Sequence, residues 1–102
     1  MTNKYRFQLF ITGQTARSEQ AIASMRELCE TRLAGRYELD VIDVLDRPDL
    51  ADAAKILATP TLIKAEPPPT RRIIGELSHG DEVLFRLGIA PRPGTLRREG
   101  SQ

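Results

Sequence analysis

The chain has 102 residues, a formal net charge of +1 and 40% hydrophobic residues. This length allows one domain with one modest core. A net charge near zero gives no long-range attraction to nucleic acid, and no apolar run approaches the roughly 20 residues that a membrane-spanning helix needs. The first residues lack the order of a signal peptide. We therefore expect a cytoplasmic protein that binds neither nucleic acid nor membranes.

The first half of the chain predicts a strand, a long helix and a second strand. Residues 5–11 place apolar side chains at every second position, which is the period of a strand. Over residues 15–33 the apolar spacing changes to three and four, which predicts an amphipathic helix capped by Thr15 or Ser18. Residues 37–44 carry apolar side chains on both faces, so we predict a covered, interior strand. A βαβ unit of this kind has parallel strands and a right-handed crossover.

The second half predicts a short helix, two strands and a final helix. Asp46 is placed to cap a helix whose first turn tolerates Pro48. Strands are predicted at residues 61–64 and 71–75, antiparallel because only a short proline-rich link joins them. The spacing of Ser78 and Asp81 is that of a capping box, which predicts the start of the last helix.

The resulting order, βαβαββα, predicts an α/β protein of the thioredoxin-like class. In this arrangement a four-stranded mixed sheet carries helices on both faces. We assign residues 1–89 to this single domain. Residues 90–102 begin with Ala-Pro-Arg-Pro-Gly, which neither continues a helix nor pairs as a central strand, so we expect a disordered tail.

The sequence lacks the groups that catalysis requires. Thioredoxin-like redox enzymes place Cys-x-x-Cys in the turn after the first strand, where the helix N-terminus lowers the thiol pKa. Here that turn, residues 12–18, has no cysteine, and the one cysteine, Cys29, belongs to the apolar stripe of the following helix. The one histidine, His79, has no neighbours that complete a metal site. We therefore predict a protein-binding module with no enzymatic activity, no cofactor and no metal.

Two alternatives stay open on the residues alone. Thr15 and Ser18, near Pro60, provide hydroxyls that a glutathione-binding enzyme of this fold class would use, although helix capping explains them as well. A homo-oligomeric scaffold is the second alternative. The sequence also leaves open whether the peptide bond before Pro60 is cis or trans.

Four longer strings are more specific than the fold. They are VIDVL at 41–45, KILATPTL at 55–62, the three prolines 67–69 and RRIIGELS at 71–78. On these strings the chain, from about Tyr5 to Leu87, resembles the KaiB family of circadian-clock proteins.

The resemblance implies a function in binding. KaiB proteins bind the N-terminal ATPase ring of the hexameric KaiC and, in complete clocks, then sequester KaiA; they are not enzymes. It implies a KaiC-like ATPase as partner, and a KaiA-like protein where one exists, in an oscillator, a timer or a stress response. The basic residues that the resemblance assigns to partner contact are Lys55, Lys64, Arg71 and Arg72.

The resemblance also implies a choice between two folds. Some family members switch between a tetrameric βαββααβ ground state and the thioredoxin-like monomer. Switching members carry Gly and Asp where this chain has Arg86 and Gly88, and Pro91 removes a backbone donor that a terminal strand needs. With Pro60, these three residues are the candidate determinants of the fold state. We expect a predominantly thioredoxin-like protein, monomeric or dimeric, with weak or no switching. The sequence leaves the oligomeric state open between a monomer, a homo-dimer and a homo-tetramer.

Overall fold

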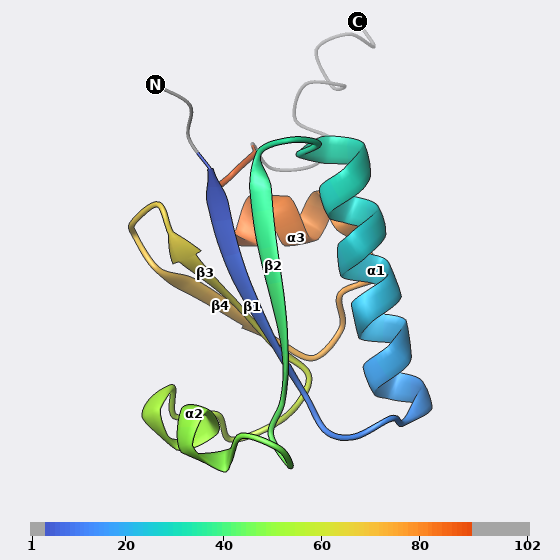
Figure 1. Ribbon diagram of the computed structural model, residues 1–102. Coiled ribbons are helices and arrows are strands. Elements are labelled where there is room, and N and C mark those ends of the chain that lie inside the picture. The colour runs from blue at the N-terminus through green and yellow to red at the C-terminus, as the bar shows by residue number, and fades with distance from the viewer. Residues whose placement is uncertain (1–3, 91–102) are drawn as a thin grey trace, which may run out of the picture.

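The computed structural model describes residues 4–90. The elements follow the predicted order βαβαββα (Figure 1). They are β1 (Tyr5–Ile11), α1 (Ala16–Arg32), β2 (Tyr37–Asp43), α2 (Pro48–Ala53), β3 (Thr61–Glu66), β4 (Arg71–Ile74) and α3 (Gly80–Arg86). The predicted end of the domain, residue 89, lies one residue before the end of the described range. Pro91 and the rest of the expected disordered tail, residues 91–102, lie outside the described residues. Ala90, the first residue assigned to that tail, instead packs against the core, and its amide donates to the Leu84 carbonyl at 3.3 Å.

The four strands form one mixed sheet in the order β2-β1-β3-β4. β1 runs parallel to β2 and antiparallel to β3, and β3 is antiparallel to β4. The prediction of an interior strand at 37–44 was wrong, because β2 is an edge strand and only half-buried. Apolar residues on two faces indicate that both faces are covered. They do not indicate whether a strand has a neighbour on each side.

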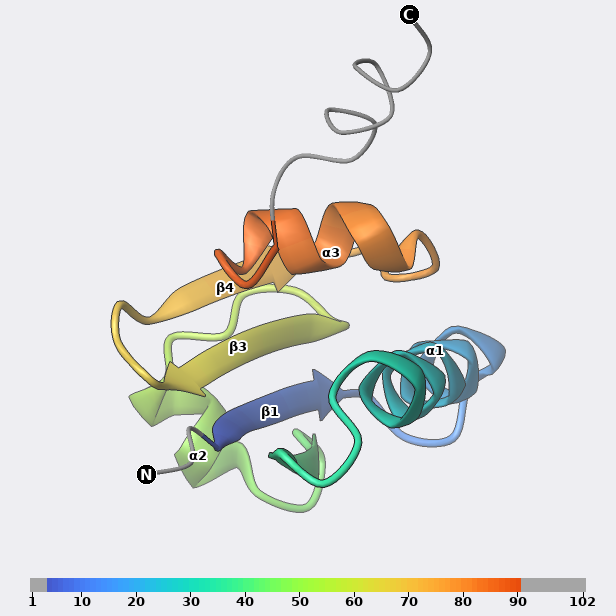
Figure 2. The ribbon, with the colours of Figure 1, turned by 90° about the horizontal axis from the view of Figure 1, so that it is seen from above.

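Helices cover both faces of the sheet, as predicted. α1 and α3 lie on one face and α2 lies on the other (Figure 2). The main core lies under α1 and α3, where Leu9 pairs with Leu62 across the sheet and Leu62 with Ile73. Phe10 and Ile63 point to the opposite face and are also buried. Burial on both faces fixes the strand register, because a slip of one residue would exchange the two faces.

The ends of the helices agree with the sequence in one case and differ in two. The hydroxyl of Thr15 caps α1 by accepting the Ser18 amide at 3.1 Å. The predicted cap at Asp46 was wrong, since the turn continues by one residue and α2 begins after Arg47. The predicted capping box was also wrong. His79 precedes α3 without a side-chain cap, because the Ser78 hydroxyl is bonded to the Glu76 carboxylate instead.

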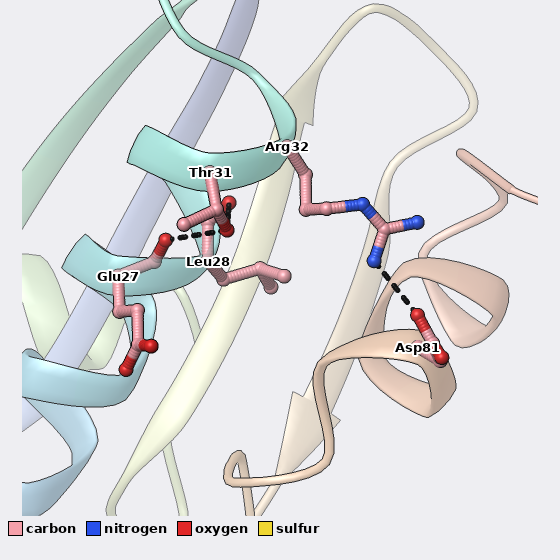
Figure 3. A network of polar contacts seen from close by, with 5 residues as sticks. All are labelled: Glu27, Leu28, Thr31, Arg32 and Asp81. Carbon is pink, nitrogen blue, oxygen red and sulfur yellow. Dashed lines mark hydrogen bonds and ion pairs between the residues drawn. The ribbon is translucent and has the colours of Figure 1, made fainter.

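The last turn of α1 contacts the first turn of α3. The Arg32 guanidinium lies 2.7 Å from the Asp81 carboxylate (Figure 3). Both side chains are substantially exposed, so this ion pair contributes at most about 1 kcal/mol. Gly80 permits the closeness, because a Cβ at this position would lie 2.9 Å from Leu28 Cδ1. No helix within residues 4–90 is long and apolar enough to cross a membrane.

Candidate partner-binding surface

The turn between β1 and α1 is closed by its own hydroxyl groups. Ser18 is 4% exposed, and its hydroxyl donates to the Thr12 carbonyl at 3.1 Å while accepting from the Thr15 hydroxyl at 3.0 Å. The hydroxyls of Thr12 and Thr59 lie 2.6 Å apart, which joins this turn to the segment that carries Pro60. The two hydroxyls of the glutathione alternative are therefore engaged within the protein.

Asp43 organises the same end of the sheet. One of its carboxylate oxygens accepts hydrogen bonds from the backbone amides of Gly13, at 3.0 Å, and Leu45, at 2.9 Å. Sequence analysis did not assign a role to Asp43. Its position at the end of a strand, followed by a turn, was the available signal. The structure also settles the open question at Pro60, whose preceding peptide bond is cis.

The thiol of Cys29 is buried in the core and away from this turn. Burial, followed by the charge of Glu30, raises its pKa to about 11. At pH 7 the reactive thiolate is then on the order of 1 in 10,000 of the molecules. The thiol is therefore part of the packing and is chemically inert in the native state.

We expect the native protein to resist thiol reagents at pH 8 and to react at the rate of a free cysteine once urea unfolds it. The raised pKa also means that folding favours the neutral thiol. Its contribution to stability is complete below pH 9 and is lost as pH rises toward 11. The free energy of unfolding in urea, compared between pH 8 and pH 11, measures this loss of stability. Cys29→Ala is the control, because it lacks the thiol and therefore this pH dependence. Equal reactivity in the native and unfolded states would contradict the assignment.

Three candidate residues of the fold state fall within the described range. Pro60 is buried directly before β3, and Arg86 is exposed in the last turn of α3. Gly88 has φ of +77°, a left-handed conformation that favours glycine. Its amide donates to the Phe85 carbonyl, and the Ile89 amide donates to the Leu84 carbonyl. These two bonds form the Schellman motif that ends α3.

The four basic residues assigned to partner contact do not form one patch. Arg71 and Arg72 are neighbours in β4, so their side chains point to opposite faces of the sheet. Arg71 lies beside Gly88 on the α3 side. Arg72 reaches the α2 side and donates to the Ala54 carbonyl at 2.8 Å and, more weakly, to the Lys55 carbonyl at 3.4 Å. Arg72 therefore holds the end of α2 against the sheet.

Lys64 does not lie on the surface. Its side chain is 4% exposed, and its ammonium donates to the carbonyls of Pro67 at 2.6 Å and Pro69 at 2.9 Å. Burial, with the nearby charge of Arg71, lowers the pKa of Lys64. The expectation of an accessible contact at Lys64 is therefore corrected, because the aliphatic chain fills the core side of the hairpin and the ammonium is used internally.

Sequence analysis missed a set of exposed apolar side chains around α2. Leu57 is 94% exposed, Leu45 68% and Ile74 56%. Ile74 shares a face of β4 with Arg72, whose guanidinium contacts the backbone two and three positions before Leu57. Lys55 is exposed beside them. We define this set as the α2-side surface: Leu45, Lys55, Leu57, Arg72 and Ile74.

Comparison with known proteins assigns the chain to a family. Residues 8–89 match the KaiB domain. The chain belongs to the KaiB family. It is 46% identical over 89 residues to circadian clock protein KaiB3 of Synechocystis sp., with 87% of each chain covered. It is 49% identical over 85 residues to the circadian clock oscillator protein KaiB of Prochlorococcus marinus MIT 9313, with 83% of this chain and 71% of the relative covered. As a KaiB-type clock protein it belongs to a non-catalytic family.

Solved structures confirm the thioredoxin-like fold of this KaiB protein. The N-terminal domain of Synechococcus elongatus SasA aligns with a TM-score of 0.69 at 21% identity, over 96% of this chain and 88% of that one. Mitochondrial thioredoxin 3 of Saccharomyces cerevisiae aligns with a TM-score of 0.68 at 16% identity, over 86% and 80%. At these identities the likeness establishes the fold alone. Within residues 4–90, no cluster of three or more potential metal ligands is present.

Proposed function

We propose that this KaiB protein acts in the cytoplasm as a binding module that docks on the N-terminal ATPase ring of a KaiC-like hexamer. The observation that carries the proposal is the KaiB domain match across residues 8–89. In a complete clock, the docked protein would then bind a KaiA-like protein. The described residues support a role in recognition, because the turn that holds reactive cysteines in related folds is filled here by hydroxyls bonded to one another.

The α2-side surface is the proposed centre of the contact. Its three large apolar side chains, Leu45, Leu57 and Ile74, are all exposed, and burying such a side chain contributes about 1.5–3 kcal/mol. Leu57 follows Lys55 by two residues, and Ile74 shares a face of β4 with Arg72, so the surface combines apolar side chains with positive charge. In protein interfaces the buried apolar residues provide affinity, and charges at the rim mainly increase the rate of encounter.

Binding to the purified N-terminal ring of a KaiC-like protein tests this proposal. We expect Leu57→Ala to weaken binding by about tenfold, mainly through faster dissociation. We expect Lys55→Glu to slow association, and the effect to diminish at high salt. Surface plasmon resonance at two salt concentrations separates the two rates.

Arg26→Glu is the matched control, because Arg26 is an exposed cation of α1 outside the proposed contact. It should reproduce the change in net charge without the loss of affinity. No binding by the unmodified protein would refute the proposed function. Unchanged rates for Lys55→Glu would remove this residue from the contact.

A further inference from the structure

Lys64 is a buried cation that has no carboxylate partner among the described residues 4–90. Within residues 4–90 its only polar contacts are the carbonyl oxygens of Pro67 and Pro69. Its register partner in β4 is Arg71, a second cation. Burying a charge beside a like charge costs free energy, and an apolar side chain of similar size at such a position is often neutral or stabilising. The presence of lysine here therefore requires an explanation other than stability.

The segment that Lys64 contacts cannot organise itself through its own backbone. Residues 67–69 are prolines, which have no amide hydrogen to close a turn. The carbonyls of Pro67 and Pro69 converge on one ammonium group, so both point inward. Pro68, Pro69 and Thr70 are left exposed at the end of the hairpin, next to the exposed Arg71. An ammonium is suited to this role because its donors are arranged around a single atom.

We propose that Lys64 is a positioning residue of the binding module: it fixes the turn at residues 67–70 in one shape, and the KaiC-like partner recognises that turn together with Arg71. This inference rests on the proposed function and adds a second contact, on the face opposite the α2-side surface. A turn that is already ordered binds without the cost of ordering it, which raises affinity without a new contact. Lys64 acts through the turn and does not touch the partner.

Lys64→Met tests the inference, because it keeps the length and apolar packing of the side chain and removes its donors. For the measurement on the turn the matched control is Lys55→Met, the same substitution at an exposed lysine. We expect the NMR order parameter of the Thr70 amide to fall in Lys64→Met, while those of β1 are unchanged, because the turn loses the group that fixes its shape. Affinity for the KaiC-like ring should fall by about tenfold, with an unaltered dependence of the dissociation constant on salt. Lys55→Met should leave the Thr70 order parameter as it is; because Lys55 belongs to the α2-side surface, Arg26→Met is the control for affinity.

Two results would overturn the inference. One is an unchanged order parameter of the Thr70 amide in Lys64→Met. The other is a reduced salt dependence of binding, which would make Lys64 a direct charge contact. Should Lys64→Met not fold, Lys64→Leu, which also lacks donors, takes its place in the same measurements. Failure of the unmodified protein to bind the ring would refute the proposed function, whereas the NMR measurement tests the effect on the turn without any partner.

Discussion

For a double variant, Arg86→Gly with Gly88→Asp, we expect a free energy of unfolding about 2 kcal/mol lower than that of the natural chain. Gly88 adopts φ of +77°, and a side chain in the left-handed region costs about 1–2 kcal/mol. Arg86 lies in the last turn of α3, where glycine costs about 0.5–1 kcal/mol. Urea denaturation followed by circular dichroism measures the sum.

The same change bears on the choice between folds. We propose that Arg86 and Gly88 hold the chain in the thioredoxin-like state, and a loss of about 2 kcal/mol shifts any equilibrium with a competing state by roughly 30-fold. NMR spectra of the double variant should then show a second set of signals that the natural chain lacks. Gly88→Ala and Arg86→Ala are the controls, since each isolates one cause. Equal stability of the double variant and the natural chain would contradict this account.

Lys64→Glu is expected to destabilise the fold by about 3–5 kcal/mol at pH 7. The substitution would place a carboxylate, in a site that is 4% exposed, opposite the two carbonyls that now accept from the ammonium. A buried carboxylate that faces carbonyl oxygens has a cost of this size, and attraction to its register partner Arg71, which is exposed, offsets only a part of it. Loss of partner binding in this variant would therefore report unfolding and not a lost contact. Thermal and urea denaturation measure the change directly.

The pH dependence of that variant provides a further check. Burial raises the pKa of a carboxyl group, so folding of the variant should favour its protonated form. The variant should be less impaired at pH 4.5, where the carboxyl group gains its proton, and the loss should grow as pH rises through the raised pKa. Arg71→Glu changes the exposed register partner of Lys64, and it should show little of this loss of stability. A stability of Lys64→Glu close to that of the natural chain would show that Lys64 is not buried.

Local sequence patterns determined the elements and their order. Alternation over residues 5–11 and the three- and four-residue spacing over 15–33 reflect strand and helix geometry directly, and both elements are present. The strings KILATPTL at 55–62 and RRIIGELS at 71–78 indicated the family, and both lie within the matched KaiB domain. Each of these features depends on residues that are close in the chain, which is why the sequence contains them.

Only the tertiary structure decided how the basic residues are used. Lys64 and Arg71 are paired across one hairpin, yet Lys64 is buried and Arg71 is exposed. Lys64 can be buried because its ammonium donates to the carbonyls of Pro67 and Pro69, which follow β3. Arg72 donates to the Ala54 carbonyl because α2 lies on its face of the sheet. The exposure of Leu57 is likewise decided by the tertiary structure, because no segment within residues 4–90 covers its side chain. The contact of Arg72 joins segments that are distant in the chain, whereas the contacts of Lys64 are local and depend on the face to which its strand turns the side chain. A cation or leucine has the same sequence signature whether it faces solvent or the protein interior.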